Sequence, residues 1–172
     1  MQLKAKGINF KYKDDKYILK DIDFTIDGNK LSKKGYSPVQ LIFQHPEKSV
    51  NPKWKMDKIL KEAFEPSKEL LDDMGIKKEW LKRWPSELSG GELQRFCVVR
   101  ALSPETKFLI ADEMTTMLDA ITQAQIWNVV LEHVKKYNIG LIVISHEKAL
   151  VNRICDRIVD LTEFKELSSN IE

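Results

Sequence analysis

Three short, continuous apolar runs constrain this sequence most: VQLIF (39–43), FLIA (108–111) and LIVIS (141–145). An alternating strand leaves one face in water, whereas an uninterrupted apolar run is typical of a strand covered on both faces. A helical pattern separates the last two runs, and strands that alternate with helices are typical of a parallel sheet. The runs therefore predict an α/β fold whose parallel sheet is covered on both faces.

The clearest helical pattern is DAITQAQIWNVVLEHVKKY, residues 119–137. Its apolar residues recur at helical spacing, and Asp119 stands before them as a predicted N-cap. The residues predicted to share one stripe are Ile121, Ala124, Trp127, Leu131 and Val134.

Two other regions have patterns of their own. Residues 8–12 and 22–26 alternate apolar and polar residues around a polar KDDK, which predicts an antiparallel hairpin. Residues 51–87 are helical in pattern and charged, and we interpret them as a helical subdomain inserted beside the sheet. The predicted breaks in this subdomain are Pro66, Gly75 and Pro85.

Composition narrows the function classes. The chain has 172 residues, which predicts a single domain, residues 1–172. Its 31% charged residues are interleaved and sum to +2, so no basic stripe favours nucleic acid. The two cysteines, Cys97 and Cys155, lie in apolar, helical surroundings, which is typical of reduced thiols. With no signal pattern and no run long enough to cross a bilayer, we expect a cytoplasmic protein that reaches a membrane only through a partner.

The stretch LSGGELQR (88–95) joins two glycines to a helix-forming run. Ser89 and Glu92 have the spacing of a capping box, in which each side chain accepts a hydrogen bond from a backbone amide at the helix start. Gly90 and Gly91 also let a ligand approach the backbone, and a helix N-terminus attracts phosphate. Caps are more common than anion sites, so both interpretations stay open on these residues alone.

Two adjacent carboxylates, Asp112 and Glu113, follow the run FLIA. Ligands of open α/β sheets bind at the carboxyl ends of the strands. A functional interpretation gives Asp112 to a Mg²⁺ ion and makes Glu113 a general base that polarises an attacking water. The structural alternative is an Asp that caps the next turn and a Glu on the surface.

Single polar residues also follow the other two runs: His146 comes after LIVIS, and Gln44 after VQLIF. A lone histidine is most often structural or exposed, and a loop glutamine is most often solvated. The functional alternative for Gln44 is a metal ligand or an amide that orients a water. On these residues alone the structural alternative stays ahead, and the weight of Gln44 comes from the other motifs around it.

Taken in order, these motifs resemble those of the ATP-binding subunit of an ABC transporter. The matching segments are Gln44 in FQHPEKSVNP (Q-loop), LSGGELQR (signature), FLIADE (Walker B), MLDA at 117–120 (D-loop) and SH at 145–146 (switch histidine). The sequences of the segments FQHPEKSVNP and ADEMTTMLDA are most similar to those of importers of oligopeptides and nickel. The resemblance implies a P-loop NTPase-like ABC ATPase fold with ATP and Mg²⁺ as cofactors.

The resemblance also implies roles for individual residues. It implies catalytic roles for Glu113, His146 and Gln44, and Mg²⁺ coordination by Asp112 and Gln44. The signature would bind the γ-phosphate of ATP held mainly by a second subunit, and Tyr12 would stack on adenine. The residues that the resemblance assigns to ATP are Tyr12, Leu88, Ser89, Gly90, Gly91, Glu92 and Asp119.

One family motif is absent. No glycine of the sequence is followed by Lys, so the phosphate-binding loop G-x-x-x-x-G-K-[ST] does not occur. Only 17 residues separate Ile26 from Gln44, whereas a strand-helix-strand unit takes roughly 30 or more. We interpret this as an in-frame deletion of the strand and helix around that loop. We therefore expect very weak hydrolysis at the chain's own site, and unpaired strand edges and exposed apolar faces beside the gap.

The leading interpretation is an ATP-binding subunit that powers import of a peptide or nickel through a membrane permease. Its expected partners are a second ABC ATPase subunit and the permease, at the inner face of the cell membrane. One alternative is a non-catalytic subunit that supplies only its signature, and another is an inactive deletion fragment. Soluble ABC proteins of DNA repair or translation fit less well, because the chain has neither a long coiled coil nor a second cassette.

Overall fold

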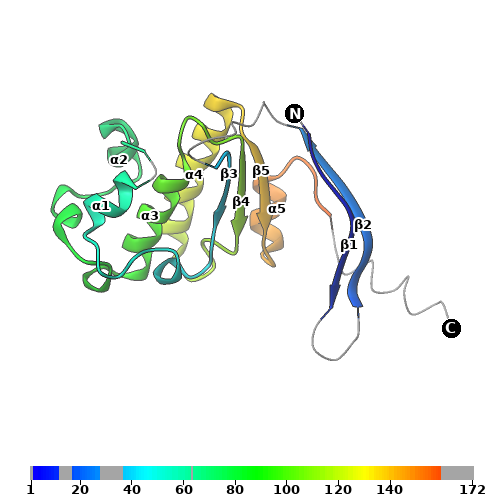
Figure 1. The fold of residues 1–172 in the computed structure, drawn as a ribbon, viewed down its shortest axis with the longest axis horizontal. Helices are drawn as coiled ribbons and strands as arrows, with labels where there is room; N and C mark the ends of the chain where they lie inside the picture. The colour runs from blue at the N-terminus through cyan, green and yellow to red at the C-terminus, as the bar shows by residue number, and fades with distance from the viewer. Residues whose placement is uncertain (1, 12–16, 28–36, 63, 160–172) are drawn as a thin grey trace.

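A computed structural model describes residues 2–11, 17–27, 37–62 and 64–159. Figure 1 shows the order of the elements along the chain. The strands are β1 (Gln2–Lys11), β2 (Tyr17–Asp27), β3 (Val39–Ile42), β4 (Phe108–Asp112) and β5 (Gly140–Ile144). The α-helices are α1 (Met56–Lys61), α2 (Lys68–Asp73), α3 (Gly90–Ala101), α4 (Ala120–Tyr137) and α5 (Lys148–Ile154). The 3₁₀ helices are η1 (Pro46–Lys48), η2 (Lys78–Lys82) and η3 (Pro85–Glu87).

The three apolar runs form a parallel sheet in the order β3-β4-β5. Leu41 pairs with Ile110, which in turn pairs with Ile142, so the three strands end at the same edge. The two alternating runs pair as the antiparallel hairpin of β1 and β2. The predicted α/β class, the parallel sheet and the hairpin are therefore confirmed.

One face of the sheet carries most of the core. In Figure 1, α3 and α4 lie on this face. Ile42 and Ala111 point to it and are buried together with Phe96 and Val99 of α3 and Val130 of α4. A close-packed interior of this kind is the main source of folding free energy in a domain of this size.

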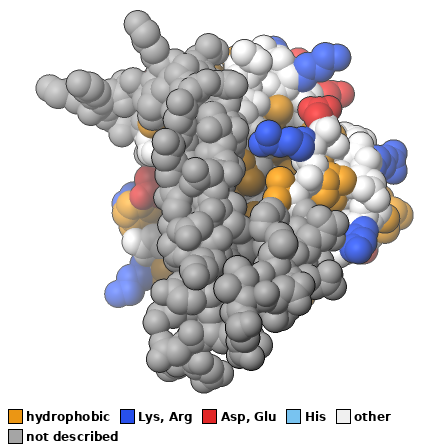
Figure 2. Space-filling model, turned by 90° about the vertical axis from the view of Figure 1, so that its right-hand side faces the viewer, with side chains coloured by type: hydrophobic (Ala, Val, Ile, Leu, Met, Phe, Trp, Pro, Cys, Tyr) orange, Lys and Arg blue, Asp and Glu red, His pale blue; other side chains and the backbone are white. Residues whose placement is uncertain are grey.

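The opposite face is exposed at its carboxyl end, although Phe108 at its other end is fully buried. Leu41, Phe43 and Ile144 lie on this face, because side chains two apart along a strand share a face. Their side chains are 43%, 47% and 49% exposed. In Figure 1, α5 lies on this side, and none of its residues is fully buried. Figure 2 views the molecule from this side and shows apolar side chains next to atoms that are not described. The prediction that both faces are covered is wrong here, because no described helix packs across the ends of β3 and β4.

The helical segment between β3 and α3 packs onto α3. Met56 and Ile59 of α1 are fully buried, and Trp80 of η2 is 7% exposed. Ser67 caps α2 by accepting a hydrogen bond from the Leu70 amide at 3.1 Å. Gly75 ends α2 with a φ of 69°, a conformation that favours glycine. The predicted helical character of this region is confirmed, as short helices broken near the expected positions.

Two details of the sequence prediction need correction. Ile121 is 73% exposed and Ala124 is exposed, so the buried stripe of α4 is Ile126, Trp127 and Val130. Cys97 is buried in α3, where burial raises the pKa of its thiol to about 12. Cys155 is only half-buried and follows α5 rather than lying within it.

Candidate functional site

The first group of predicted site residues lies at the start of α3. Ser89 Oγ accepts a hydrogen bond from the Glu92 amide at 3.3 Å, and Glu92 Oε2 accepts one from the Ser89 amide at 2.7 Å. The predicted capping box is therefore confirmed. Because these two bonds occupy the amides of Ser89 and Glu92 only, the box leaves the amides of Gly90 and Gly91 to other partners.

The two glycines have different surroundings. A Cβ atom added to Gly90 would meet no atom within 4 Å, whereas one added to Gly91 would lie 3.4 Å from Leu118. Internal packing therefore does not require glycine at position 90. An exposed helix N-terminus without a side chain is a shape that lets an anion reach the backbone amides.

The signature and the D-loop meet in one open hollow. Its volume is about 280 Å³, and it is lined by Trp80, Ser89, Gly91, Glu92, Arg95, Met117, Leu118, Asp119 and Thr122. Asp119 stands at its far side and caps α4 by accepting hydrogen bonds from two amides at 3.0 and 3.1 Å. These backbone and side-chain hydrogen bonds, chiefly with Thr122, hold the pKa of the Asp119 carboxyl below its usual value. Leu88 instead packs against the core.

The second group lies at the carboxyl edge of the sheet. Gln44 follows β3, Asp112 ends β4, and His146 follows β5 by two residues. Glu113 extends the β4–β5 pairing, because its amide donates to the Ile144 carbonyl at 2.9 Å. Its φ of 49° is in the left-handed region, a conformation that costs a non-glycine residue of order 1 kcal/mol and is concentrated at functional sites.

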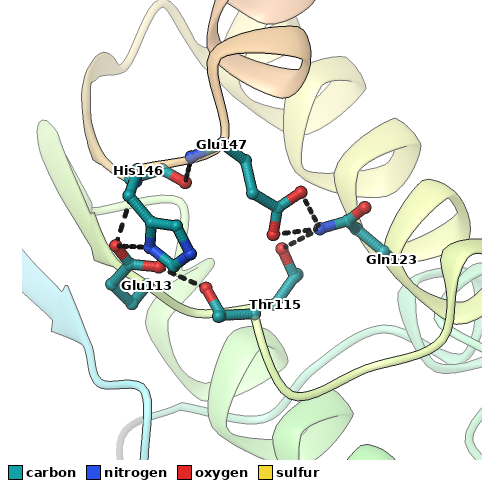
Figure 3. A network of polar contacts seen from close by, with 7 residues as sticks. Glu113, Thr115, Gln123, His146 and Glu147 are labelled. Carbon is teal, nitrogen blue, oxygen red and sulfur yellow. Dashed lines mark hydrogen bonds and ion pairs between the residues drawn. The ribbon is translucent and has the colours of Figure 1, made fainter.

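Glu113 and His146 point toward each other, as Figure 3 shows. The His146 backbone amide donates to Glu113 Oε1 at 3.1 Å, and the ring Nδ1 lies 2.8 Å from the same oxygen. Thr116 Oγ1 donates to the other carboxylate oxygen. The Glu113 side chain is 20% exposed and that of His146 is 72% exposed, so the pair opens to solvent through the histidine.

The pair shifts the acidity of both partners. Partial burial raises the pKa of Glu113, but hydrogen bonds from Thr116 and His146 outweigh it and leave the pKa below its usual value. The hydrogen bond to Glu113, and then its negative charge, raises the pKa of His146. A carboxylate held ionised next to an imidazole is an arrangement that accepts and moves protons.

Sequence reasoning missed a polar network behind this pair. Thr115 Oγ1 accepts hydrogen bonds from Trp127 Nε1 at 3.0 Å and from Gln123 Nε2 at 3.1 Å. The same Gln123 nitrogen lies 3.3 Å from both carboxylate oxygens of Glu147 (Figure 3). The adjacent threonines of ADEMTT and the acid after SH were the signals in the sequence.

The residues fit the implied cofactors unequally. Asp112 and Gln44 offer two oxygen donors at one sheet edge, and Mg²⁺ is bound through one or two protein ligands beside phosphate oxygens. In the described part of the chain, no three His, Cys, Asp or Glu residues are grouped to hold a metal ion without such phosphates. The motif G-x-x-x-x-G-K-[ST], whose amides cradle phosphates, does not occur in the sequence. Tyr12, expected at adenine, lies outside the described residues.

The sequence is similar to those of several named transport proteins. The oligopeptide transport ATP-binding protein OppF of Bacillus subtilis is 37% identical over 133 residues, which cover 70% of this chain and 44% of OppF. The glutathione import ATP-binding protein GsiA of Pectobacterium atrosepticum is 37% identical over 155 residues, 79% of this chain and 25% of GsiA. This chain thus spans a quarter to a half of these two proteins. The nickel import system ATP-binding protein NikE of Staphylococcus aureus N315 is 30% identical over 202 residues, 94% of this chain and 87% of NikE.

Solved structures share the fold. The dimeric structure of MJ0796, a bacterial ABC transporter cassette, superposes with a TM-score of 0.68 at 18% identity, covering 92% of this chain and 93% of the cassette. A family model described as "ABC transporter" matches residues 12–116, a span that includes the signature and the end of β4. None of the helices in the described ranges is long and apolar enough to span a membrane. The fold, the family model and the relatives agree, and the protein belongs to the ABC transporter family as one of its ATP-binding cassettes.

Proposed function

We propose that this chain is an ATP-binding subunit of an ABC importer and that its signature completes the nucleotide site of a second cassette. The observation that carries this proposal is the start of α3. Gly90 has open space around the position of a Cβ atom, while Ser89 and Glu92 hold the helix start in a formed capping box. An anion site that is preorganised but open on one side fits a phosphate presented by another subunit.

The hollow beside Gly90 also supports binding of a phosphate at the start of α3. Ser89 and Asp119 line it from two helix starts, α3 and α4, both of which present the positive end of a helix dipole. Arg95 adds a guanidinium to its lining. A phosphate there would accept hydrogen bonds from backbone amides at the start of α3 and from the Ser89 hydroxyl.

The chain's own sheet edge is proposed to be inactive alone. Glu113 and His146 are arranged for proton transfer, but no residues of this sequence supply the phosphate cradle. The NikE alignment supports an internal gap: 94% of 172 residues is about 162, so about 40 of the 202 aligned positions lack a counterpart here. The exposed Leu41, Phe43 and Ile144 fit the same deletion, because a missing strand and helix would leave such a face uncovered.

The import class and the location follow from the relatives. The named relatives import oligopeptides, glutathione and nickel, so we infer that the cargo is a peptide or nickel and that a separate permease carries it. The cassette would then work at the inner face of the cell membrane. Asp112 and Gln44 would hold Mg²⁺, which neutralises phosphate charge when a nucleotide is bound.

A second candidate function is hydrolysis at the chain's own edge. The formed contact between Glu113 and His146 favours it, because a cassette without turnover has no need for that pair. The two candidates differ in which residue the activity depends on. The first requires the open amide end at Gly90, and the second requires the Glu113 carboxylate as well.

The test is the ATPase rate of this chain purified together with a cassette that has its own phosphate-binding loop. Gly90→Ala fills only open space, so the fold should keep its stability while the rate of the pair falls at least tenfold. Glu113→Gln should leave the rate within about twofold, since the chain's own edge is not in use. A loss with both variants supports the second candidate, and a pair no faster than the partner alone identifies an inactive fragment.

A further inference from the structure

The polar network behind Glu113 connects three segments of the chain. Thr115, in the turn after β4, is 2% exposed, and its hydroxyl oxygen is the point where Trp127 and Gln123 converge. Trp127 is itself 3% exposed, so this end of the network is fixed in the core. Buried polar groups that are fully paired hold one geometry, because losing a partner leaves the other unsatisfied.

Gln123 extends this fixed point to the segment that carries His146. Its Nε2 donates to Thr115 and lies 3.3 Å from both oxygens of Glu147, the residue directly after His146. A bond from an amide to an ionised carboxylate is stronger than one between neutral groups. Gln123 thereby joins α4 to the segment between β5 and α5.

Packing of that segment onto the core is partial, because Leu150 and Ile154 of α5 pack against the core without being fully buried. Ile144, immediately before it, is 49% exposed, and α5, immediately after it, has no fully buried residue. The side chain of His146 is 72% exposed. The contact between Glu147 and Gln123 therefore adds a side-chain tie from this segment to α4, beside the hydrogen bonds of Ile144 and His146 with Glu113.

We propose that Gln123 is a positioning residue that holds the His146 segment against Glu113 through its contact with Glu147 and Thr115. Asp119, the N-cap of α4, lines the signature hollow, and Gln123 contacts Glu147 from one turn further along the helix, so α4 connects the two groups of site residues. The proposal deepens the second candidate function, hydrolysis at the chain's own edge, on which it rests only for the roles of Glu113 and His146.

The test is backbone amide hydrogen exchange at His146, measured by NMR on the full chain without nucleotide or partner. Gln123 is distant in sequence, so Gln123→Ala does not alter the intrinsic exchange rate of that amide. We expect exchange about tenfold faster in Gln123→Ala, because one net hydrogen bond to a charged group is lost. The 15N shift of His146 Nδ1 should move in the same variant, toward that of a histidine without the Glu113 contact.

The swap of both partners separates positioning from loss of stability. Gln123→Glu combined with Glu147→Gln keeps an amide–carboxylate pair in reversed order, so protection should return to within about threefold of the parent chain. Asn128→Ala, at an exposed position of α4, is the matched control and should leave exchange at His146 unchanged. Unchanged exchange in Gln123→Ala, or a folded swap variant without recovered protection, overturns the proposal. Because no nucleotide is present, these results stand apart from the ATPase test of the proposed function.

Discussion

The two faces of the parallel sheet differ sharply in how they are covered. On the side of α3 and α4, Phe96, Val99 and Val130 are fully buried. On the other side, Leu41, Phe43 and Ile144 are each between 43% and 49% exposed. Among the described residues, α3 and α4 pack on the first side, and no helix packs across the ends of β3 and β4 on the second.

The comparison separates two functional halves. The covered side supports the signature and the D-loop, whose helix starts are capped and whose hollow is formed. The uncovered side adjoins β5 and the Glu113–His146 pair, where a nucleotide has no phosphate cradle in this sequence. This difference is what the proposed function expects of a chain whose signature serves a second cassette.

The largest expected effect comes from truncating one phenylalanine on each face. Phe96→Ala removes a fully buried side chain from α3 and should destabilise the fold by about 3–5 kcal/mol. Phe43→Ala, at a position 47% exposed, should cost less than about 1 kcal/mol. Urea unfolding of both variants measures the difference. Equal losses would mean that the second face is covered in solution.

A smaller effect is expected from the helix caps. Ser89→Ala and Ser67→Ala each remove a hydroxyl that accepts one amide hydrogen bond, at 3.3 and 3.1 Å. Each should cost about 1 kcal/mol in thermal unfolding. Only Ser89→Ala should also lower the ATPase rate of the pair formed with a second cassette. If Ser67→Ala lowered that rate equally, the loss would reflect stability rather than the signature.

Neighbouring residues of β5 provide a finer comparison, because they point to opposite faces. Ile144→Thr should change stability by less than about 0.5 kcal/mol and reduce self-association, since it removes exposed apolar area. Val143→Thr, on the side that packs against the core, should lower stability without reducing self-association. Light scattering and urea unfolding distinguish the two. Unchanged scattering in Ile144→Thr would show that the exposed face is not what associates.

The smallest effect is the titration of His146. Its folded pKa is raised above the ordinary 6.5 by Glu113, so the contact stabilises the fold fully below pH 6.5. That contribution is lost as the pH rises through the raised pKa. Glu113→Gln should return the NMR titration midpoint of His146 toward 6.5. A midpoint that does not move would show that the two side chains are apart in solution.

Local patterns predicted the elements well, because each depends on nearby residues. The apolar runs predicted β3, β4 and β5, and the S-x-x-E spacing predicted the capping box at Ser89. Asp119 was predicted as the cap of α4 and accepts two amide hydrogen bonds there. These features follow from strand composition and helix-end chemistry alone.

Long-range features were harder to predict. The exposure of Leu41 could not be read from its own run, because it depends on whether a distant segment packs there. The stripe of α4 was misplaced at Ile121 for a related reason, since burial of a helical residue depends on which distant segments pack against it. Gln123 was missed because its partners, Thr115 and Glu147, are 8 and 24 residues away. Polar contacts of this kind leave no periodic signal.

Mg-ATP binding to the purified chain alone, measured by isothermal titration calorimetry, tests most directly whether the chain's own sheet edge forms a nucleotide site. The sequence contains no phosphate-binding loop, so we expect no saturable binding to the single chain at millimolar nucleotide. Binding should then appear when a cassette with its own phosphate-binding loop is added, and it should weaken in Gly90→Ala. Saturable binding to the chain alone that Glu113→Gln or Asp112→Asn alters would contradict the account, because it would show a working site at the chain's own sheet edge.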